Sequence, residues 1–288
     1  MLVFGKQGVG KTWTGVQLPK VYMIDCEEGG GREQYQEHLL RSGGMYLDRA
    51  LGAGSFETVI QEVRTLAAEK HDYQTLLIDS LTKLTLIENA AERERIGSND
   101  PFSSYKKAGV AKTMRLLDAI SKLDMNVILT AHEVPEWATQ DGKREQVGVM
   151  PDCYDKVGYE LDLVLRIMST SKGNRIAQVY KSRILSFPEG DKINLQVNGT
   201  DTSYAEFSKR YGIEALEGAA TPVEFATPEQ VAEIERLIAM FKPDADEVKK
   251  KLVACRAETW AELTVEQADG AINKWLKKKI ETPKEGDK

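Results

Sequence analysis

Short apolar runs alternate with helical patterns along most of the chain, and this alternation predicts the fold. Five runs are compact and mainly apolar, which is typical of buried strands rather than half-exposed ones. Most of the segments between them have the spacing of apolar residues that amphipathic helices show. Such a series predicts an α/β domain with a mainly parallel, twisted sheet and helices on both faces. We expect strands at 21–26, 75–80, 126–132, 161–167 and 175–182, and helices at about 12–18, 55–69, 81–96 and 106–123.

The pattern changes in the last third of the chain, where small residues and prolines form a segment typical of a linker. Thr227 with Gln230, and later Thr264 with Gln267, have the spacing of a capping box in front of an apolar helical stripe. These signals predict a small helical module after the linker. We expect an α/β core at 1–213, the linker at 214–226, the module at 227–280 and a frayed or disordered tail at 281–288.

Composition excludes several classes of protein. The 288 residues are 41% hydrophobic, which suits one large domain with an ordinary core and a small appendage. No apolar run reaches the length of a membrane span and no signal peptide is evident, so we expect a soluble, intracellular protein. Cys26, Cys153 and Cys255 lie far apart and are expected to be structural. A net charge of −6 gives no general attraction to nucleic acid, so DNA contacts would need local patches or an oligomeric channel.

A glycine-rich segment stands at the start of the chain. Gly5, Gly10, Lys11 and Thr12 fit the pattern G-x-x-x-x-G-K-[ST], in which backbone N–H groups surround phosphates, the lysine reaches the β- and γ-phosphates and the hydroxyl binds Mg²⁺. A helix beginning at Lys11 would also direct its N-terminus at the anion. The alternative is a glycine-rich turn without a ligand. The motif predicts that ATP and Mg²⁺ bind at Gly5, Lys6, Gln7, Gly8, Val9, Gly10, Lys11 and Thr12.

Only Met1 to Phe4 precede this loop, which is short for a central parallel strand. Either the strand is trimmed or residues are missing upstream. We expect a start site placed late or a truncated sequence.

Two carboxylates at strand ends are candidates for the chemistry of ATP hydrolysis. Asp79 ends an apolar strand, where it can order the Mg²⁺ shell beside Thr12, and Ser80 follows it. The Asp-Glu pair of many ATPases is absent here, so the general base must come from elsewhere. Glu27 lies just past the second predicted strand, at the sheet edge where ligands bind, and can orient the attacking water. Glu28 is the nearest alternative, and the other is that Glu27 is an ordinary loop carboxylate.

The strand at 126–132 ends in His132, which can sense the γ-phosphate and signal to the segment that follows; the alternative is a capped strand end. We expect the stretch 133–157 to be a long polar loop and 96–109 to be a second one, and such loops are usually functional or disordered. Aromatic residues mixed with cations suit single-stranded DNA through stacking and phosphate contact, and the alternative is a surface loop without a ligand. The candidate DNA-binding residues are Tyr105, Lys106, Lys107, Trp137, Lys143 and Arg144.

In this order the motifs resemble the RecA-like recombinase core, most closely the small phage-encoded RecA-fold ATPases of the Sak-type single-strand annealing group. The resemblance covers roughly residues 1–210. It implies that Glu27, in the sequence Ile-Asp-Cys-Glu, activates water and that Asp79 ends the metal-binding strand. It implies that His132 is the polar switch residue, where RecA has glutamine, and that the two expected loops bind DNA.

The resemblance also implies a role for Lys181 and Arg183 in the sequence VYKSRILSFP, because two basic residues at this spacing in the family reach the γ-phosphate of a neighbouring subunit. On a strand, residues i and i+2 share a face, so both cations can address one site. A cation supplied by a neighbour stabilises the transferred phosphoryl group. The alternative is two solvated cations at a sheet edge. RecA's N-terminal polymerisation arm has no counterpart here, so the form of the oligomer stays open.

We therefore expect an ATP-dependent, single-stranded-DNA-binding protein that assists recombination or annealing, with ATP hydrolysis at subunit interfaces and stimulated by DNA. Its expected partners are DNA, further copies of itself in a ring or filament, and a single-strand-binding protein, with no membrane. The expected location is the bacterial cytoplasm, as a bacterial or a phage protein. One alternative is a nucleotide-gated loader or partner-binding switch. The other is a small-molecule P-loop kinase, whose usual arginine-bearing lid is not evident.

Overall fold

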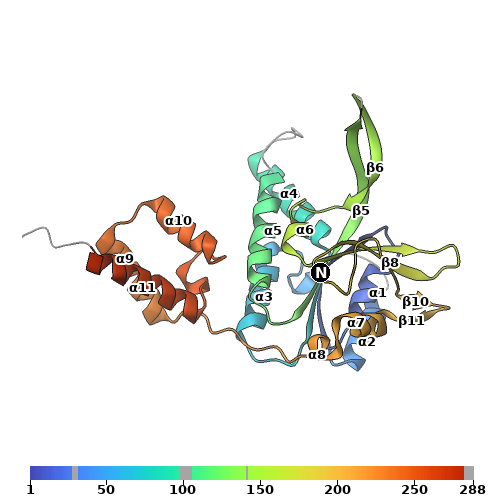
Figure 1. Cartoon of the computed structure of the whole chain (residues 1–288), viewed down its shortest axis with the longest axis horizontal. Coiled ribbons are helices and arrows are strands. Elements are labelled where there is room, and N and C mark those ends of the chain that lie inside the picture. Colours follow the sequence, from blue (N-terminus) through green and yellow to red (C-terminus); the bar gives the residue numbers. More distant parts are fainter. Residues whose placement is uncertain (28–31, 98–105, 141, 282–288) are drawn as a thin grey trace, which may run out of the picture.

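The computed structural model describes residues 1–27, 32–97, 106–140 and 142–281, which form an α/β core and a helical module (Figure 1). The core sheet has the strand order β3-β2-β4-β5-β1-β7-β8-β9, with β6 paired to β5. The predicted α/β class with a mainly parallel sheet is confirmed, because every pairing from β3 to β7 is parallel and only β6, β8 and β9 run antiparallel to their neighbours. The strands are β1 (Leu2–Gly5), β2 (Val21–Asp25), β3 (Met45–Leu47), β4 (Thr75–Asp79), β5 (Asn126–Gln140), β6 (Lys143–Pro151), β7 (Leu163–Ser169), β8 (Arg175–Ser182) and β9 (Lys192–Asn194).

Helices cover both faces of the sheet, which is why β1, β2 and β4 are apolar and buried along their whole length. On one face α3 (Phe56–Ala68), α4 (Leu81–Ile96) and α5 (Lys106–Ile120) enclose one apolar cluster. On the other face α1 (Lys11–Val16), α2 (Arg32–Arg41), α7 (Ser203–Tyr211) and α8 (Ile213–Leu216) enclose a second. A further short helix, α6 (Val157–Glu160), precedes β7, and the 3₁₀ turn η1 (Arg49–Leu51) follows β3.

The prediction that 133–157 is a loop is wrong for most of its length. Strand β5 continues beyond His132 to Gln140 and pairs with β6, from Glu133 with Pro151 to Gln140 with Lys143. The resulting hairpin projects from the sheet as an arm (Figure 1). Most of its side chains are exposed or only partly buried, so the sequence shows no clean alternation of apolar and polar residues there. The signal that predicts it is the Asp-Gly dipeptide at 141–142, which favours a tight hairpin turn.

Small elements near the end of the core were also not predicted. The ribbon β10 (Gln196–Val197) and β11 (Thr200–Asp201) turns at Asn198 and Gly199, both with positive φ. An Asn-Gly pair favours this turn because both residues tolerate the left-handed region. The ribbon lies next to β9 in sequence and brings Asp201 toward β8.

The C-terminal module contains α9 (Pro228–Phe241), α10 (Ala245–Ala254), the 3₁₀ turn η2 (Trp260–Glu262) and α11 (Val265–Glu281). Both predicted capping boxes form: Thr227 and Gln230 exchange two hydrogen bonds, as do Thr264 and Gln267. Ile234 and other apolar residues of the helices form the module's own core. None of the helices in the described part of the chain is long and apolar enough to cross a membrane.

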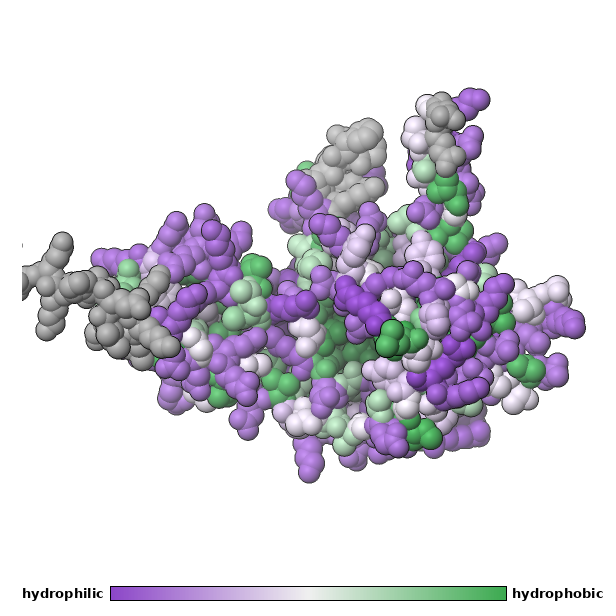
Figure 2. All heavy atoms as spheres, viewed as in Figure 1, coloured by the Kyte–Doolittle hydropathy of each residue, from purple (hydrophilic) through white to green (hydrophobic). Residues whose placement is uncertain are grey.

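Charged contacts join the module to the core along α3 and α5. Arg64 lies 3.0 Å from a carboxylate oxygen of Glu262, and Arg115 lies 2.6 Å from one of Glu258. The surface of the module is largely hydrophilic in Figure 2. This arrangement leaves the loop-bearing edge of the sheet, where β1, β2 and β4 end and β5 continues into the hairpin, for the candidate site.

Candidate functional site

The glycine-rich loop follows β1 and leads into α1, and two of its glycines are required by close approaches. A Cβ on Gly5 would lie 2.5 Å from the carbonyl oxygen of Ile167 on β7. Gly10 has a φ of 90°, and its Cβ would lie 2.6 Å from Nη1 of Arg175. The backbone carbonyl of Ile167 leaves no room for a Cβ on Gly5, and the positive φ of Gly10 strains any other residue at that position, so glycine is required at both.

Lys11 is folded into the loop it belongs to. Its ammonium donates hydrogen bonds to the carbonyl oxygens of Gly5 at 3.1 Å and Lys6 at 3.0 Å. Burial lowers the pKa of Lys11, and the nearby carboxylates of Asp79, Glu27 and Glu133 oppose that shift. A cation inside the loop that donates to carbonyl groups of the loop is suited to exchange those partners for phosphate oxygens.

The end of β4 forms the predicted partner of Thr12. The hydroxyl of Thr12 donates to Oδ2 of Asp79 at 2.6 Å, and the hydroxyl of Thr130 on β5 donates to the other oxygen. Burial raises the pKa of Asp79, whereas these two donors lower it. No cluster of three or more histidine, cysteine or acidic side chains able to hold a metal occurs among the described residues.

One hydroxyl and one carboxylate nevertheless fit Mg²⁺, because this ion is usually bound by one or two protein groups together with substrate phosphates and water. Thr12 and Asp79 are adjacent to the ammonium of Lys11, where phosphates would lie. The residues present therefore fit Mg²⁺ in the presence of a nucleotide.

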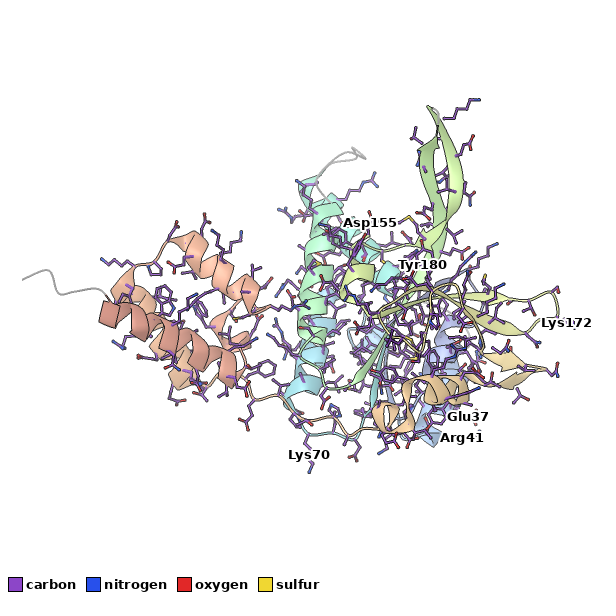
Figure 3. The ribbon with its side chains drawn as sticks, in the orientation of Figure 1. Glu37, Arg41, Lys70, Asp155, Lys172 and Tyr180 are labelled. Atoms are coloured by element: carbon purple, nitrogen blue, oxygen red, sulfur yellow. The ribbon has the colours of Figure 1, made fainter. Side chains whose placement is uncertain are left out.

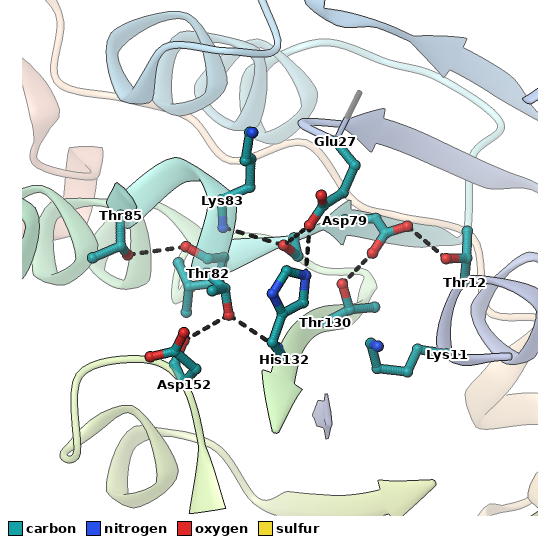
Figure 4. Close-up of polar contacts among 12 residues, drawn as sticks. Lys11, Thr12, Glu27, Asp79, Thr82, Lys83, Thr85, Thr130, His132 and Asp152 are labelled. Carbon is teal, nitrogen blue, oxygen red and sulfur yellow. Dashed lines mark hydrogen bonds and ion pairs between the residues drawn. The ribbon is translucent and has the colours of Figure 1, made fainter. Parts of the chain in front are cut away.

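Three predicted residues from three different elements meet beside Asp79 (Figure 4). Nε2 of His132 donates to Oε1 of Glu27 at 3.0 Å, and the hydroxyl of Ser80 donates to the same oxygen. Ser80 also caps α4 by accepting a hydrogen bond from the amide of Lys83. Glu27 is thus held at the edge of the sheet by neighbours from β5 and from the start of α4, while its side chain stays partly exposed.

The backbone of Glu27 is fixed by Asp25, the last residue of β2. A carboxylate oxygen of Asp25 accepts the amide of Glu27 at 2.9 Å, and the other accepts the hydroxyl of Tyr46 at 2.5 Å. Asp25 is buried, so its carboxylate is directed into the fold. Glu28, the alternative candidate for the base, lies outside the described residues.

His132 connects the site to the arm. Its amide donates to the hydroxyl of Thr82 at 3.0 Å, and that hydroxyl donates to the carbonyl oxygen of Asp152 at 2.6 Å, just past the end of β6 (Figure 4). In the sheet His132 lies opposite Gly5, the first residue of the loop. The hairpin therefore begins at a residue that contacts both Glu27 and the strand leading into the loop.

Sequence reasoning missed an ion pair on the other side of β1. Arg166 on β7 donates two hydrogen bonds to Glu133, at 2.8 and 3.1 Å, and the carboxylate side chain is only 5% exposed. Arg166 is paired in register with Phe4, directly before the loop. The two residues are 33 positions apart in the sequence, so no local pattern indicates their contact.

Lys181 and Arg183 lie at the opposite edge of the sheet. Lys181 is opposite Val164, near the start of β7, and donates to the carbonyl oxygen of Leu161. Strand β8 ends at Ser182, so Arg183 lies beyond it and the argument from a shared strand face does not apply to this residue. Arg183 donates to the carbonyl oxygen of Tyr159 and lies 3.8 Å from Asp162. A role across a subunit interface stays a prediction.

The candidate DNA-binding residues fall into two groups. Trp137, Lys143 and Arg144 lie on the hairpin, where the guanidinium of Arg144 lies 5.3 Å from the ring centroid of Trp137 and the tryptophan is 49% exposed. In the second group, Tyr105 lies outside the described residues. Lys106 and Lys107 form the first turn of α5 rather than a loop; Lys107 is exposed, and the side chain of Lys106 is not described.

A scan against known protein families gives one match, in which residues 1–209 fit the model described as an AAA domain. The chain belongs to this family of AAA-type P-loop ATPases. The matched range includes the loop, Glu27, Asp79 and His132, and it ends before the C-terminal module. No curated protein matches the chain.

The AAA domain match supports nucleotide binding, typically with Mg²⁺, at the glycine-rich loop. It does not separate phage annealing ATPases from other AAA-type ATPases, so that closer relationship stays a prediction.

Proposed function

We propose that this AAA domain hydrolyses ATP with Glu27 as the base that orients water, and that the nucleotide state controls binding of single-stranded DNA by the hairpin of an oligomer. The observation that carries the proposal is the contact between Glu27 and His132 at 3.0 Å. Glu27 is the residue that we assign to act on water, and His132 belongs to the strand that continues into the hairpin. The protein would assist recombination or annealing of DNA.

The hydrolytic step assigns one task to each side chain near the loop. Lys11 contacts the β- and γ-phosphates, and Thr12 with Asp79 holds Mg²⁺, which neutralises charge on those phosphates when bound. A water oxygen attacks the γ-phosphorus while the bond to the bridging oxygen breaks, and a proton of that water passes to Glu27. The products are ADP and inorganic phosphate. Most of the rate enhancement in such a reaction comes from positioning and charge stabilisation. The fixed contacts of Glu27 serve the positioning of water, and the ammonium of Lys11 serves the charge stabilisation.

Coupling to DNA follows from the continuity of β5. A water beside Glu27 would compete for the carboxylate oxygen that His132 now contacts, and a γ-phosphate would compete as an acceptor for the Nε2–H of His132. A change at His132 also affects the hydrogen bond from its backbone amide to the hydroxyl of Thr82. Because that hydroxyl donates to the carbonyl oxygen of Asp152, the change reaches the end of β6. Both strands of the hairpin are therefore tied to the nucleotide site within a few residues. The nucleotide site and the hairpin are thus joined by named hydrogen bonds and by the continuous backbone of β5, and not only by lying near each other.

Self-assembly is needed for DNA binding because the chain is acidic overall, with a net charge of −6. One hairpin offers Lys143 and Arg144 as described cations and Trp137 as a stacking surface. A ring or filament would align several hairpins and so add up their base-stacking and phosphate contacts. Stacking contributes roughly 1–3 kcal/mol per base, and phosphate contacts release counterions.

The deciding experiment measures phosphate release from ATP and Mg²⁺ with and without single-stranded DNA, together with retention of a labelled oligonucleotide at low salt. We expect hydrolysis that DNA stimulates, and retention with ATP that is weaker with ADP. A rate of ATP hydrolysis that does not change when DNA is added, together with no retention of the oligonucleotide in the presence of ATP or ADP, would refute the DNA-binding part of the proposal.

A second function, a nucleotide-gated loader or partner-binding switch, is favoured by the charge of the same hairpin. Among its described residues Glu136 and Glu145 balance Lys143 and Arg144, and Glu133 is paired with Arg166, so the hairpin has no excess of positive charge. The exposed side chains of Trp137 and Val147 also suit a protein partner, and the arm carries hydrophobic as well as hydrophilic side chains (Figure 2). In this case the oligonucleotide is not retained, and the hairpin controls contact with another protein instead.

A further inference from the structure

Arg175, the first residue of β8, lies directly against the glycine-rich loop. A Cβ on Gly10 would meet its Nη1 at 2.6 Å and its Cδ at 2.9 Å, so the guanidinium fills the space beside that glycine. Its side chain is 8% exposed. Neither the loop motif nor the Asp79 and Glu27 motifs include this residue.

The guanidinium of Arg175 is bound by Asp201 and has an N–H group without a hydrogen-bond acceptor among the described residues. Nη2 donates to a carboxylate oxygen of Asp201 on β11, which itself accepts the amide of Ser203 at 2.8 Å. Nε is buried and finds no hydrogen-bond acceptor among the described residues. A buried N–H without a partner is unfavourable by about 1–3 kcal/mol, so a site of this kind favours an incoming acceptor.

The order of the sheet places Arg175 on the flank of the loop opposite to the hydrolytic residues. From β1, the neighbour on one side is β5 with His132, followed by β4 with Asp79. On the other side lie β7 and then β8 with Arg175. A triphosphate whose γ-phosphate lies beside Glu27 would therefore direct its remaining phosphates toward the Arg175 side.

We propose that Arg175, positioned by Asp201, is a further phosphate-binding residue of the nucleotide site and contacts phosphates that ATP and ADP have in common. Arginine suits this role because its planar guanidinium offers several N–H donors in a fixed arrangement and stays charged when buried. The ligand class is a nucleoside di- or triphosphate. The inference rests on the proposed nucleotide binding and adds to it a contact in the same subunit, distinct from any contact across an interface.

The test compares direct binding of labelled ATP and labelled ADP to the full chain. The main variant combines Arg175→Gln with Asp201→Asn, because removing both charges avoids leaving a buried carboxylate alone, and asparagine keeps an acceptor for Ser203. The matched control is Lys172→Gln, which removes an exposed cation from the turn just before β8 (Figure 3). Folding of each variant is checked from its Tm.

We expect the double variant to lose affinity for ATP and for ADP alike, by roughly 10- to 100-fold, since a hydrogen bond to a charged group contributes about 1.5–3 kcal/mol and 1.4 kcal/mol corresponds to a factor of ten. ATP that is bound at saturation should be hydrolysed in a single turnover at the wild-type rate. The control should bind both nucleotides as the wild type does. A role in supporting the loop alone would slow hydrolysis of bound ATP as well, and that result would contradict the proposal.

If the double variant does not fold, Arg175→Met with Asp201→Leu replaces the buried pair by apolar side chains, a change that is often tolerated. A folded variant of either kind that binds ATP and ADP with wild-type affinity overturns the role of Arg175 and leaves the proposed function intact. Failure of the wild-type protein to bind either nucleotide overturns the proposed function itself.

Discussion

Nε2 of His132 lies 3.0 Å from Oε1 of Glu27, although the two residues are 105 positions apart in the sequence. The contact joins the end of β2 to β5, and the latter is the strand that extends into the projecting hairpin. The residue opposite His132 in the sheet is Gly5, where the phosphate-binding loop begins. A single strand therefore touches the candidate base, borders the loop and forms half of the arm.

Replacing the loop lysine should abolish nucleotide binding. In the Lys11→Ala variant the ammonium that is folded into the loop is removed, and the neighbouring carboxylates Asp79 and Glu27 remain to repel phosphate. Binding of labelled ATP should fall below detection. Lys70→Ala, which removes an exposed cation away from the loop, is the control and should bind normally (Figure 3). Unchanged ATP binding by Lys11→Ala would be incompatible with a phosphate-binding loop at 5–12.

Glu27→Gln should separate binding from hydrolysis. The amide keeps the size of the side chain and can still accept from His132 and Ser80, so affinity for ATP and Mg²⁺ should stay near that of the wild type. Phosphate release should slow by roughly 10² to 10⁴-fold, the usual contribution of a general base. Glu28→Gln is the matched control: if the neighbouring substitution causes the defect and Glu27→Gln does not, the base is misassigned.

Asp79→Asn should stabilise the nucleotide-free protein while removing its metal-dependent activity. Burial raises the pKa of Asp79, so folding favours the neutral carboxyl; stability is lost as the pH rises from the ordinary carboxyl pKa to the raised pKa of Asp79, and the loss is complete above it. Asparagine resembles the neutral form. We expect the Tm of the variant without nucleotide to exceed that of the wild type at neutral pH.

The stability difference between Asp79→Asn and the wild type should shrink as the pH falls through the pKa of Asp79, because the wild-type carboxyl then becomes neutral as well. Thermal unfolding at a series of pH values measures this directly. A variant that is less stable at neutral pH would indicate that the hydrogen bonds from Thr12 and Thr130 outweigh the burial of the charge.

The residues at the centre of the candidate site have local sequence signals. Glycines at fixed spacing mark the loop, and carboxylates directly after apolar runs mark the strand ends at Glu27 and Asp79. Parallel strands bring such ends to one edge of a sheet, so the chemistry follows from the fold class. The contact between Glu27 and His132 was not predicted, but both residues were.

The sequence does not predict contacts that only the completed fold creates. Arg175 and Asp201 are 26 positions apart, and their pairing depends on where the β10–β11 ribbon lies. The hairpin was missed for a different reason: a two-stranded arm with much of both faces exposed has no apolar stripe, and periodicity is the signal on which the strand predictions relied. The Asp-Gly dipeptide at 141–142 is a local signal for its turn.

Trp137→Ala tests whether the hairpin binds single-stranded DNA. If a base stacks on this ring, binding in the presence of ATP should weaken by about 1–3 kcal/mol, whereas changes at Lys143 or Arg144 should reduce the dependence of affinity on salt. Retention of a labelled oligonucleotide over a salt series measures both effects. Val147→Ala removes an exposed apolar side chain from the same arm and is the control for general damage to the hairpin. Equal loss in both variants would contradict stacking on Trp137 and indicate general damage to the hairpin.

Arg183→Ala tests whether the two late cations act on a neighbouring subunit. Lys181 is opposite Val164 near the start of β7, while the phosphate loop follows the end of the parallel strand β1, so the two lie at opposite edges of one sheet. Within one subunit these cations are thus placed away from the loop, and any contact with a γ-phosphate has to be made in a second copy.

Hydrolysis per protein should then rise with protein concentration. Mixing Arg183→Ala with Lys11→Ala should give more phosphate release than either variant alone, because the first supplies an intact loop and the second an intact Arg183. A mixture no more active than its separate components would show that Arg183 does not act in trans and leave it as a cation bound to the carbonyl of Tyr159.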